Sequence, residues 1–249
     1  MEKKSLSKKL SNGLNIKKEK MNLLQIIFNP REAYKKIEEN SHWVTDFIIV
    51  SFLLVIAAFF MLPFTQKVIN NIEVVKNLSA NQTEMIKSTT QKLQYFGLLA
   101  EPITYIIKSL VIASLLYLGT LIFHGRNEFK KLFALTICSS IIIAMSNIAN
   151  VIILYFEGRD VVKTIYDLFP LSLNNLFKIN EIGAPLYQFL TNFNFFEIWF
   201  ILILIFGVSK ISQMNIKKSS LLVISIWLIL VAFNVFQAIM SNNALTNMH

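Results

Sequence analysis

The stretch VTDFIIVSFLLVIAAFFML, residues 44–62, decides the fold. After Asp46 it runs for sixteen residues without a charged side chain. A helix of about 20 mostly apolar residues crosses the roughly 30 Å hydrocarbon layer of a membrane. Although the stretch is rich in Ile, Val and Phe, it is too long for a strand of about 4–8 residues. It therefore predicts a transmembrane helix.

Four more segments of this kind follow, at residues 103–123, 132–154, 193–209 and 219–240. The fourth span, 193–209, is the shortest, and Asn194 and Glu197 lie near its outer end. Composition agrees with a membrane protein, because 54% of the chain is apolar and only 16% is charged. We expect an all-α polytopic membrane protein, a bundle of five transmembrane helices covering residues 44–240.

The segments before and after the bundle differ from it in composition. Residues 1–20 are rich in Lys, Ser and Asn and predict a basic disordered tail. Residues 21–43 predict a juxtamembrane amphipathic helix in the inner headgroup region, with Asn29 and Pro30 as N-cap and first helical residue. No signal-peptide cleavage site follows, so the first span should be retained. We expect residues 241–249 to form a short external tail.

Charge asymmetry orients the bundle, whose chain carries a net charge of +9. If residues 1–43 are cytoplasmic, the inner segments hold sixteen Lys and Arg and the outer ones seven. This predicts a cell-membrane protein with its N-terminus in the cytoplasm and its C-terminus outside. The surplus points to anionic lipid at the inner face and requires no nucleic-acid partner. The candidate lipid or partner surface there comprises Arg31, Lys35, Lys36, Arg126, Lys130 and Lys131.

Two long outer segments separate the spans. Apolar residues at helical spacing in 63–102 predict an external amphipathic helix, namely Val68, Ile69, Ile72, Val75 and Leu78. Segment 155–192 carries many large apolar residues that a solvated loop would not carry. We expect it either to cap the bundle or to lie in the outer interface.

Polar residues within spans are the default functional candidates of a membrane protein. Asp46, Lys108 and Glu197 lie near span ends, so we expect them at the interface; Lys108 and Glu197 could pair if both face inward. Amides lie deeper: Asn147 and Asn150 share one face of the third span with Ser140, and Asn234 and Gln237 one face of the fifth. We interpret the amides as interhelical hydrogen-bonding groups in preference to a substrate path.

Catalytic, cofactor and metal motifs are absent from the sequence. It has no GxSxG, HExxH, P-loop or GxGxxG pattern, and His42, His124 and His249 are far apart. The single cysteine, Cys138, falls inside the third span and is interpreted as a packing residue. We therefore expect a non-enzymatic protein without a cofactor or a resident metal.

Three stretches resemble the Yip domain family of Ypt/Rab-interacting proteins: FNPREAY at 28–34, GRNEFKKLFAL at 125–135, and FEIW at 196–199 followed by FGVS at 206–209. The resemblance is to bacterial-type members. It implies an adaptor or accessory subunit for another membrane system, either trafficking-like or associated with an ABC-type exporter in defence against toxic peptides. Eukaryotic relatives contact small GTPases through a DLYGP-type motif before the first span, and this chain lacks that motif.

Two further possibilities remain open from the sequence. The protein could form a homo-oligomer in place of a complex with another membrane protein. It could also be a small-solute transporter or channel-like protein that uses the polar faces of the third and fifth spans.

Overall fold

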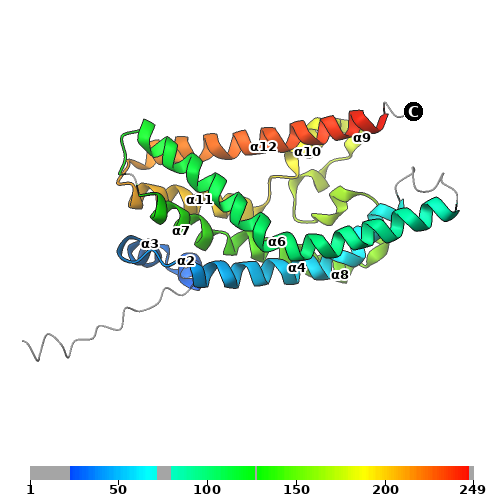
Figure 1. Cartoon of the computed structure of the whole chain (residues 1–249). Helices are drawn as coiled ribbons and strands as arrows, with labels where there is room; N and C mark the ends of the chain where they lie inside the picture. The colour runs from blue at the N-terminus through cyan, green and yellow to red at the C-terminus, as the bar shows by residue number, and fades with distance from the viewer. Residues whose placement is uncertain (1–22, 72–79, 127, 247–249) are drawn as a thin grey trace, which may run out of the picture.

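The computed structural model describes residues 23–71, 80–126 and 128–246 (Figure 1), and all regular structure in these ranges is helical. The principal helices are α2 (Leu24–Phe28), α3 (Pro30–Glu39), α4 (Val44–Asn71), α6 (Ala80–Ile122), α7 (Phe129–Ser139), α8 (Ile141–Glu157), α11 (Phe195–Ile211) and α12 (Ile216–Thr246). Between α8 and α11 lie the short elements η1 (Arg159–Val161), η2 (Ile165–Leu168), η3 (Leu173–Leu176), α9 (Ile179–Ile182) and α10 (Ala184–Leu190).

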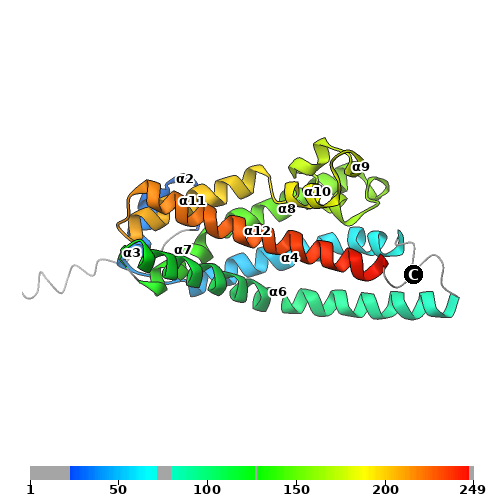
Figure 2. The ribbon, with the colours of Figure 1, turned by 90° about the horizontal axis from the view of Figure 1, so that it is seen from above.

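The long helices form an elongated bundle (Figures 1 and 2), with α2 and α3 at one end and the short elements at the other. Helix α4 packs on α6 and α8, and α11 packs on α7, α8 and α12. The core is largely apolar, and its most enclosed side chains include Val50, Leu116, Leu132, Leu135, Ile137 and Ile142. The prediction of an all-helical protein is confirmed for the described residues.

Four helical segments are long and apolar enough to cross a membrane: Val44–Ile69, Lys87–Ile122, Phe129–Glu157 and Ile216–Gln237. Helix α11 has 17 residues, which corresponds to about 25 Å at 1.5 Å per residue. It joins the segment that follows α8 to the turn before α12, at the end of the bundle near α3 (Figure 1). The chain is thus multi-pass, and a fifth crossing would require α11 to span the membrane.

The third predicted span, 132–154, lies within one helical segment, Phe129–Glu157, whose backbone is irregular at Ser140. Helix α7 ends at Ser139 and α8 begins at Ile141, yet the backbone N–H of Ser140 still donates to the carbonyl of Thr136, and that of Ala144 to the carbonyl of Ser140. The hydroxyls of Thr136, Ser139 and Ser140 donate to the carbonyls of Leu132, Leu135 and Thr136 at 3.0, 2.7 and 2.8 Å. Such back-bonding competes with the helical ladder and bends helices, which accounts for the local irregularity at Ser140.

The predicted external helix within 63–102 is wrong in its bounds. Helix α4 continues past Pro63 to Asn71, and α6 begins already at Ala80, so both span helices extend outward. Val68 and Ile69 belong to α4, while Ile72, Val75 and Leu78 fall outside the described residues. Extending an existing helix needs no new nucleus, and Gln94 Nε2 donates to Thr65 Oγ1 at 3.3 Å between the two extensions.

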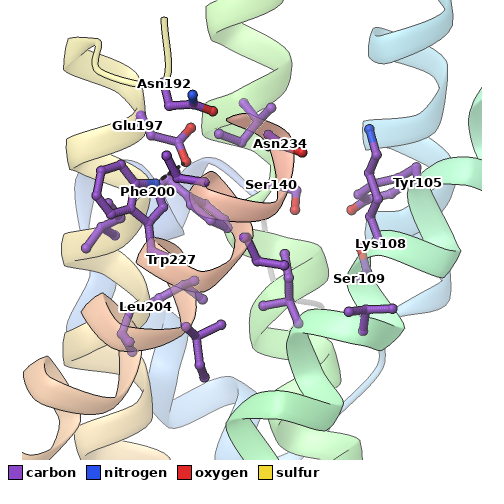
Figure 3. A pocket seen from close by; sticks show the side chains of 18 of the residues that line it. Tyr105, Lys108, Ser109, Ser140, Asn192, Glu197, Phe200, Leu204, Trp227 and Asn234 are labelled. Carbon is purple, nitrogen blue, oxygen red and sulfur yellow. Dashed lines mark hydrogen bonds between the residues drawn. The ribbon is translucent and has the colours of Figure 1, made fainter. Parts of the chain in front are cut away.

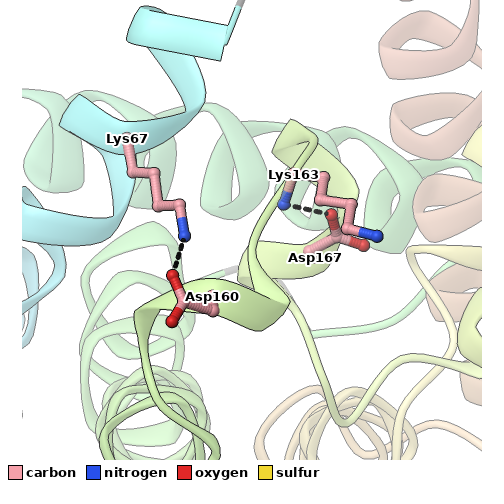
Figure 4. Close-up of polar contacts among 4 residues, drawn as sticks. All are labelled: Lys67, Asp160, Lys163 and Asp167. Carbon is pink, nitrogen blue, oxygen red and sulfur yellow. Dashed lines mark hydrogen bonds and ion pairs between the residues drawn. The ribbon is translucent and has the colours of Figure 1, made fainter.

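The segment 155–192 caps the ends of α4 and α8 that lie away from α3. Val162 and Leu168 are buried in a small cluster with Phe64, Val68 and Leu154. Figure 4 shows the polar contacts around this cap: Lys67 Nζ lies 2.9 Å from Asp160 Oδ1, and the backbone N–H of Lys163 donates to Asp167 Oδ2 at 2.8 Å. The hydrogen bond from Lys67 lowers the pKa of Asp160. Of the two placements left open, the structure favours the cap.

Two glycines allow close helix contacts near the end of the bundle that carries α3. A Cβ on Gly119 of α6 would overlap Leu222 of α12, and a Cβ on Gly207 of α11 would overlap Leu135 of α7. Both leucines are buried. Small residues let membrane helices approach closely and so increase their van der Waals contact. This contact matters because the hydrophobic effect does not favour helix association within lipid.

We predict that Gly207→Ala lowers the melting temperature of the detergent-solubilised protein, because the added methyl group forces Leu135 to move within a filled core. Overpacking of this kind costs about 1–3 kcal/mol. The control is Gly97→Ala, where nothing lies within 4 Å of the added Cβ and helix propensity alone favours Ala by up to about 1 kcal/mol. Equal melting temperatures for the two variants would show that the contact is not tight.

Candidate functional site

A pocket of about 450 Å³ lies between α6, α8, α11 and α12 (Figure 3), and Leu54 of α4 also lines it. Its lining includes the exposed residues Ile107, Lys108 and Phe233, so it opens sideways between α6 and α12. We call it the lateral crevice. Its polar lining residues are Glu101, Tyr105, Lys108, Ser109, Ser140, Asn147, Asn192, Glu197, Trp227 and Asn234.

Four of the six predicted intramembrane polar residues converge on the lateral crevice: Lys108, Asn147, Glu197 and Asn234. Asn150 and Gln237 do not line it. Asn150 is buried, and its Oδ1 accepts from the backbone N–H of Leu171 at 3.4 Å, which ties α8 to the outer cap. Gln237 is exposed on α12. Of the two predicted polar faces, Ser140, Asn147 and Asn234 line the crevice, and Asn150 and Gln237 lie outside it.

Glu197 and Lys108 do not pair as the sequence suggested. Glu197 Oε1 accepts from Trp227 Nε1 at 3.0 Å, and Glu197 and Lys108 lie on opposite sides of the crevice (Figure 3). Among the described residues no ion pair joins the two. Trp227 was missed by the sequence reasoning, although an indole N–H within a span needs an acceptor and Glu197 is a carboxylate available in the fourth span.

Asp46 is the clearest correction among the charged residues. We expected it among the headgroups, but its exposed fraction is 3%, and Cys138 Sγ lies 3.1 Å from Asp46 Oδ2. Neighbouring rings enclose this site: Trp43 packs edge-on against Phe133, and Phe47 stacks on Tyr105 with centroids 5.5 Å apart. Cys138 is buried as predicted for a packing residue and also connects α7 to α4.

Helix α3 docks on the bundle through one side chain in particular. Tyr34 is 3% exposed, and its hydroxyl donates to the carbonyl oxygen of Ile203 in α11 at 2.9 Å. Burial raises the pKa of this phenol. Ala33 and Ile37 are buried on the same face. The apolar face of α3 is thus covered by protein, and contact of its other face with headgroups stays a prediction.

The start of α3 differs in detail from the predicted cap. The helix begins at Pro30 as expected, but the Asn29 side chain accepts no backbone N–H. Instead Asn29 Nδ2 donates to Glu32 Oε2 at 2.9 Å.

A second recess, of about 920 Å³, lies between α3, the start of α7 and the end of α11. We call it the basic recess. Its lining comprises Pro30, Arg31, Tyr34, Lys35, Glu38, Glu39, Arg126, Lys131, Phe206 and Lys210. It therefore gathers four of the six residues predicted for the cytoplasmic surface; Lys36 and Lys130 lie outside it. Phe206 and Lys210 were not predicted, because their distance in sequence from α3 gives no local signal.

Ion pairs order part of the basic recess. Arg126 Nε lies 2.7 Å and Lys131 Nζ 2.6 Å from the two carboxylate oxygens of Glu128, and Arg126 Nη1 lies 4.0 Å from Glu38. The hydrogen bond from Lys131 is the main reason that the pKa of Glu128 is lowered. Among the described residues, no three His, Cys, Asp or Glu side chains gather as metal ligands.

Comparisons with known proteins agree with this architecture. A family model described as the Yip1 domain matches residues 24–236. The membrane protein YknW of Bacillus subtilis is 26% identical over 229 residues, which cover 91% of this chain and 94% of that protein. No solved structure matches.

We predict that Trp227→Phe destabilises the bundle in detergent by about 1 kcal/mol, because it leaves the Glu197 carboxylate without its donor between α11 and α12. The control is Trp199→Phe, which removes an indole that packs on Phe195 and makes no hydrogen bond among the described residues. The measurement is the melting temperature of each variant. A larger loss in the Trp199 variant would contradict the assignment.

Proposed function

The chain belongs to the Yip1 domain family and is a multi-pass membrane protein, and from this we propose that it acts as a non-enzymatic adaptor, an accessory subunit of another membrane protein system. The observation that carries the proposal is the lateral crevice with its exposed polar rim. We propose that the crevice receives a transmembrane segment of a partner protein.

The rim of the crevice supports this reading through Asn234. Asn234 is exposed and lies inside the apolar segment Ile216–Gln237. A side-chain amide facing hydrocarbon loses its hydrogen bonds with water, at a cost of a few kcal/mol. A neighbouring helix can supply a partner, since amides commonly connect membrane helices. Lys108 on the opposite rim offers a second polar contact.

Our proposal includes five spans, with the basic end in the cytoplasm and the C-terminus outside the cell membrane. Helix α11, at about 25 Å, is short for a span but within the reach of a locally thinned bilayer. Its N-terminus is capped by Asn194, whose Oδ1 accepts from the backbone N–H of Glu197 at 2.8 Å. The position of α11 between α7, α8 and α12 supports a membrane crossing.

The resemblance to bacterial Yip-type proteins suggests the kind of partner. We propose a bacterial membrane system, trafficking-like or an ABC-type exporter that defends against toxic peptides, to which this chain is an accessory. A homo-oligomer is the other arrangement that would cover the crevice, and it is an outcome of the test below.

A transporter or channel-like function is the second candidate, and one observation favours it. Asn147 of the third span and Asn234 of the fifth both line the crevice. Asn150 and Gln237 lie outside the lining, so the polar faces do not form a continuous path, which makes this candidate weaker. It requires solute flux in proteoliposomes that Asn147→Leu abolishes.

We predict that Asn234→Leu reduces recovery of a partner membrane protein several-fold in a mild-detergent pull-down from the native host, at unchanged protein level. The matched control is Gln237→Leu, which replaces an exposed amide on the same helix outside the crevice. Mass spectrometry identifies the recovered proteins, including a second copy of this chain carrying another tag.

Equal recovery with both variants would contradict docking in the crevice. Wild-type protein that repeatedly recovers no membrane partner would count against the adaptor function itself.

A further inference from the structure

We propose that the basic recess is a binding site for one anionic phospholipid, with the phosphate between α3 and α11 and an acyl chain along the outer surface of α11. This goes beyond a general attraction between positive charge and lipid, because it names a built site with a polar and an apolar part. It is independent of the proposed adaptor function, since it requires no partner protein.

The cations of the recess divide into paired and available ones. Arg126 and Lys131 both contact Glu128. Lys35 Nζ lies 3.9 Å from Glu39 Oε1 with both side chains largely exposed. An exposed ion pair of this kind contributes little free energy, because water screens it. Arg31 and Lys210 also line the recess and form no ion pair among the described residues. These two cations are available to an external anion.

Two contacts hold the walls of the recess in place before any ligand arrives. The Tyr34 hydroxyl bonds to Ile203 and so fixes α3, which carries Arg31, against α11, which carries Lys210. The backbone N–H of Arg126 donates to the carbonyl of Ser212 at 2.8 Å, which attaches the loop before α7 to the end of α11. A preformed site avoids the cost of ordering loops on binding.

An apolar ridge leads from the hydrocarbon region into the recess. Ile198, Leu202 and Phe206 follow each other at i, i+4 and i+8 on α11, and they are 53%, 46% and 53% exposed. Lys210 is the next position of this ridge, and Phe206 and Lys210 both line the recess. A phospholipid whose acyl chain lies on the ridge therefore has its headgroup phosphate next to Lys210. The Arg31 guanidinium can donate two parallel hydrogen bonds to the oxygens of that phosphate.

This continuity decides between a lipid and a soluble phosphate. A free phosphate would use the cations alone and gain nothing from exposed Phe206. A phospholipid uses both parts, and anionic lipids are attracted to basic segments at the membrane surface. The structure thus points to a glycerophospholipid with an anionic headgroup, such as phosphatidylglycerol.

The test is lipid retention by the purified full-length protein, measured by native mass spectrometry after titration with phosphatidylglycerol or phosphatidylcholine. We expect wild-type protein to retain phosphatidylglycerol in preference to phosphatidylcholine. We expect Arg31→Ala with Lys210→Ala to lower this retention by roughly tenfold or more. The control is Lys217→Ala with Lys218→Ala, which removes the same charge at the same end of the bundle from exposed positions outside the recess.

Three results would overturn the proposal. Equal losses in both double variants would indicate general surface charge, and equal retention of phosphatidylcholine would remove the requirement for an anionic headgroup. Displacement of the lipid by inorganic phosphate at similar concentration would indicate a site for the free anion. Melting curves of both double variants verify that the exposed substitutions leave the fold intact.

Discussion

The close contact of helices at the α3 end of the bundle is the constraint on which the rest of the structure depends. Leu222 of α12 packs directly against Gly119 of α6, and Leu135 of α7 packs directly against Gly207 of α11. Lipid gives no hydrophobic drive for helix association, so such packing must hold the spans together. Helix α6 also packs on α4 and crosses the bundle obliquely (Figure 1). The lateral crevice opens between α6 and α12 where they are no longer held by this contact.

The two candidate sites follow from the two ends of this arrangement. At the tight end, Tyr34 fastens α3 to α11 and leaves a recess edged by cations. Toward the other end, Glu197 and Trp227 join α11 to α12, while α6 stands apart and exposes polar groups on the rim of the crevice. One end thus carries cations that can bind a lipid phosphate. The other end exposes polar groups that can contact a partner within the membrane. Neither requires chemistry performed on a substrate.

Hydropathy was sufficient to predict the helical class and four of the five membrane segments, because the cost of leaving backbone groups unpaired in lipid allows few alternatives. It could not predict where helices stop. The extensions of α4 and α6 beyond the predicted spans are polar enough to look like loops, and the irregularity at Ser140 coincides with hydroxyl back-bonding that a hydropathy profile does not register. Periodicity grouped Asn147 with Asn150 and Asn234 with Gln237, and one residue of each pair, Asn147 and Asn234, lines the crevice. The sequence did not predict the burial of Asp46, the Glu197–Trp227 hydrogen bond or the position of Lys210 in the recess. All three depend on how helices distant in sequence pack against one another.

Topology is the central claim, because five spans with the basic end in the cytoplasm determine which leaflet supplies the lipid and where the crevice opens. The direct measurement is cysteine accessibility in cells, in a Cys138→Ala background, with single cysteines in residues 1–20 or 241–249 and a membrane-impermeant maleimide. Our topology predicts labelling of the C-terminal cysteine in intact cells and of the N-terminal cysteine only after permeabilisation. Labelling of both cysteines from the same side would contradict an odd number of spans and with it the crossing of α11.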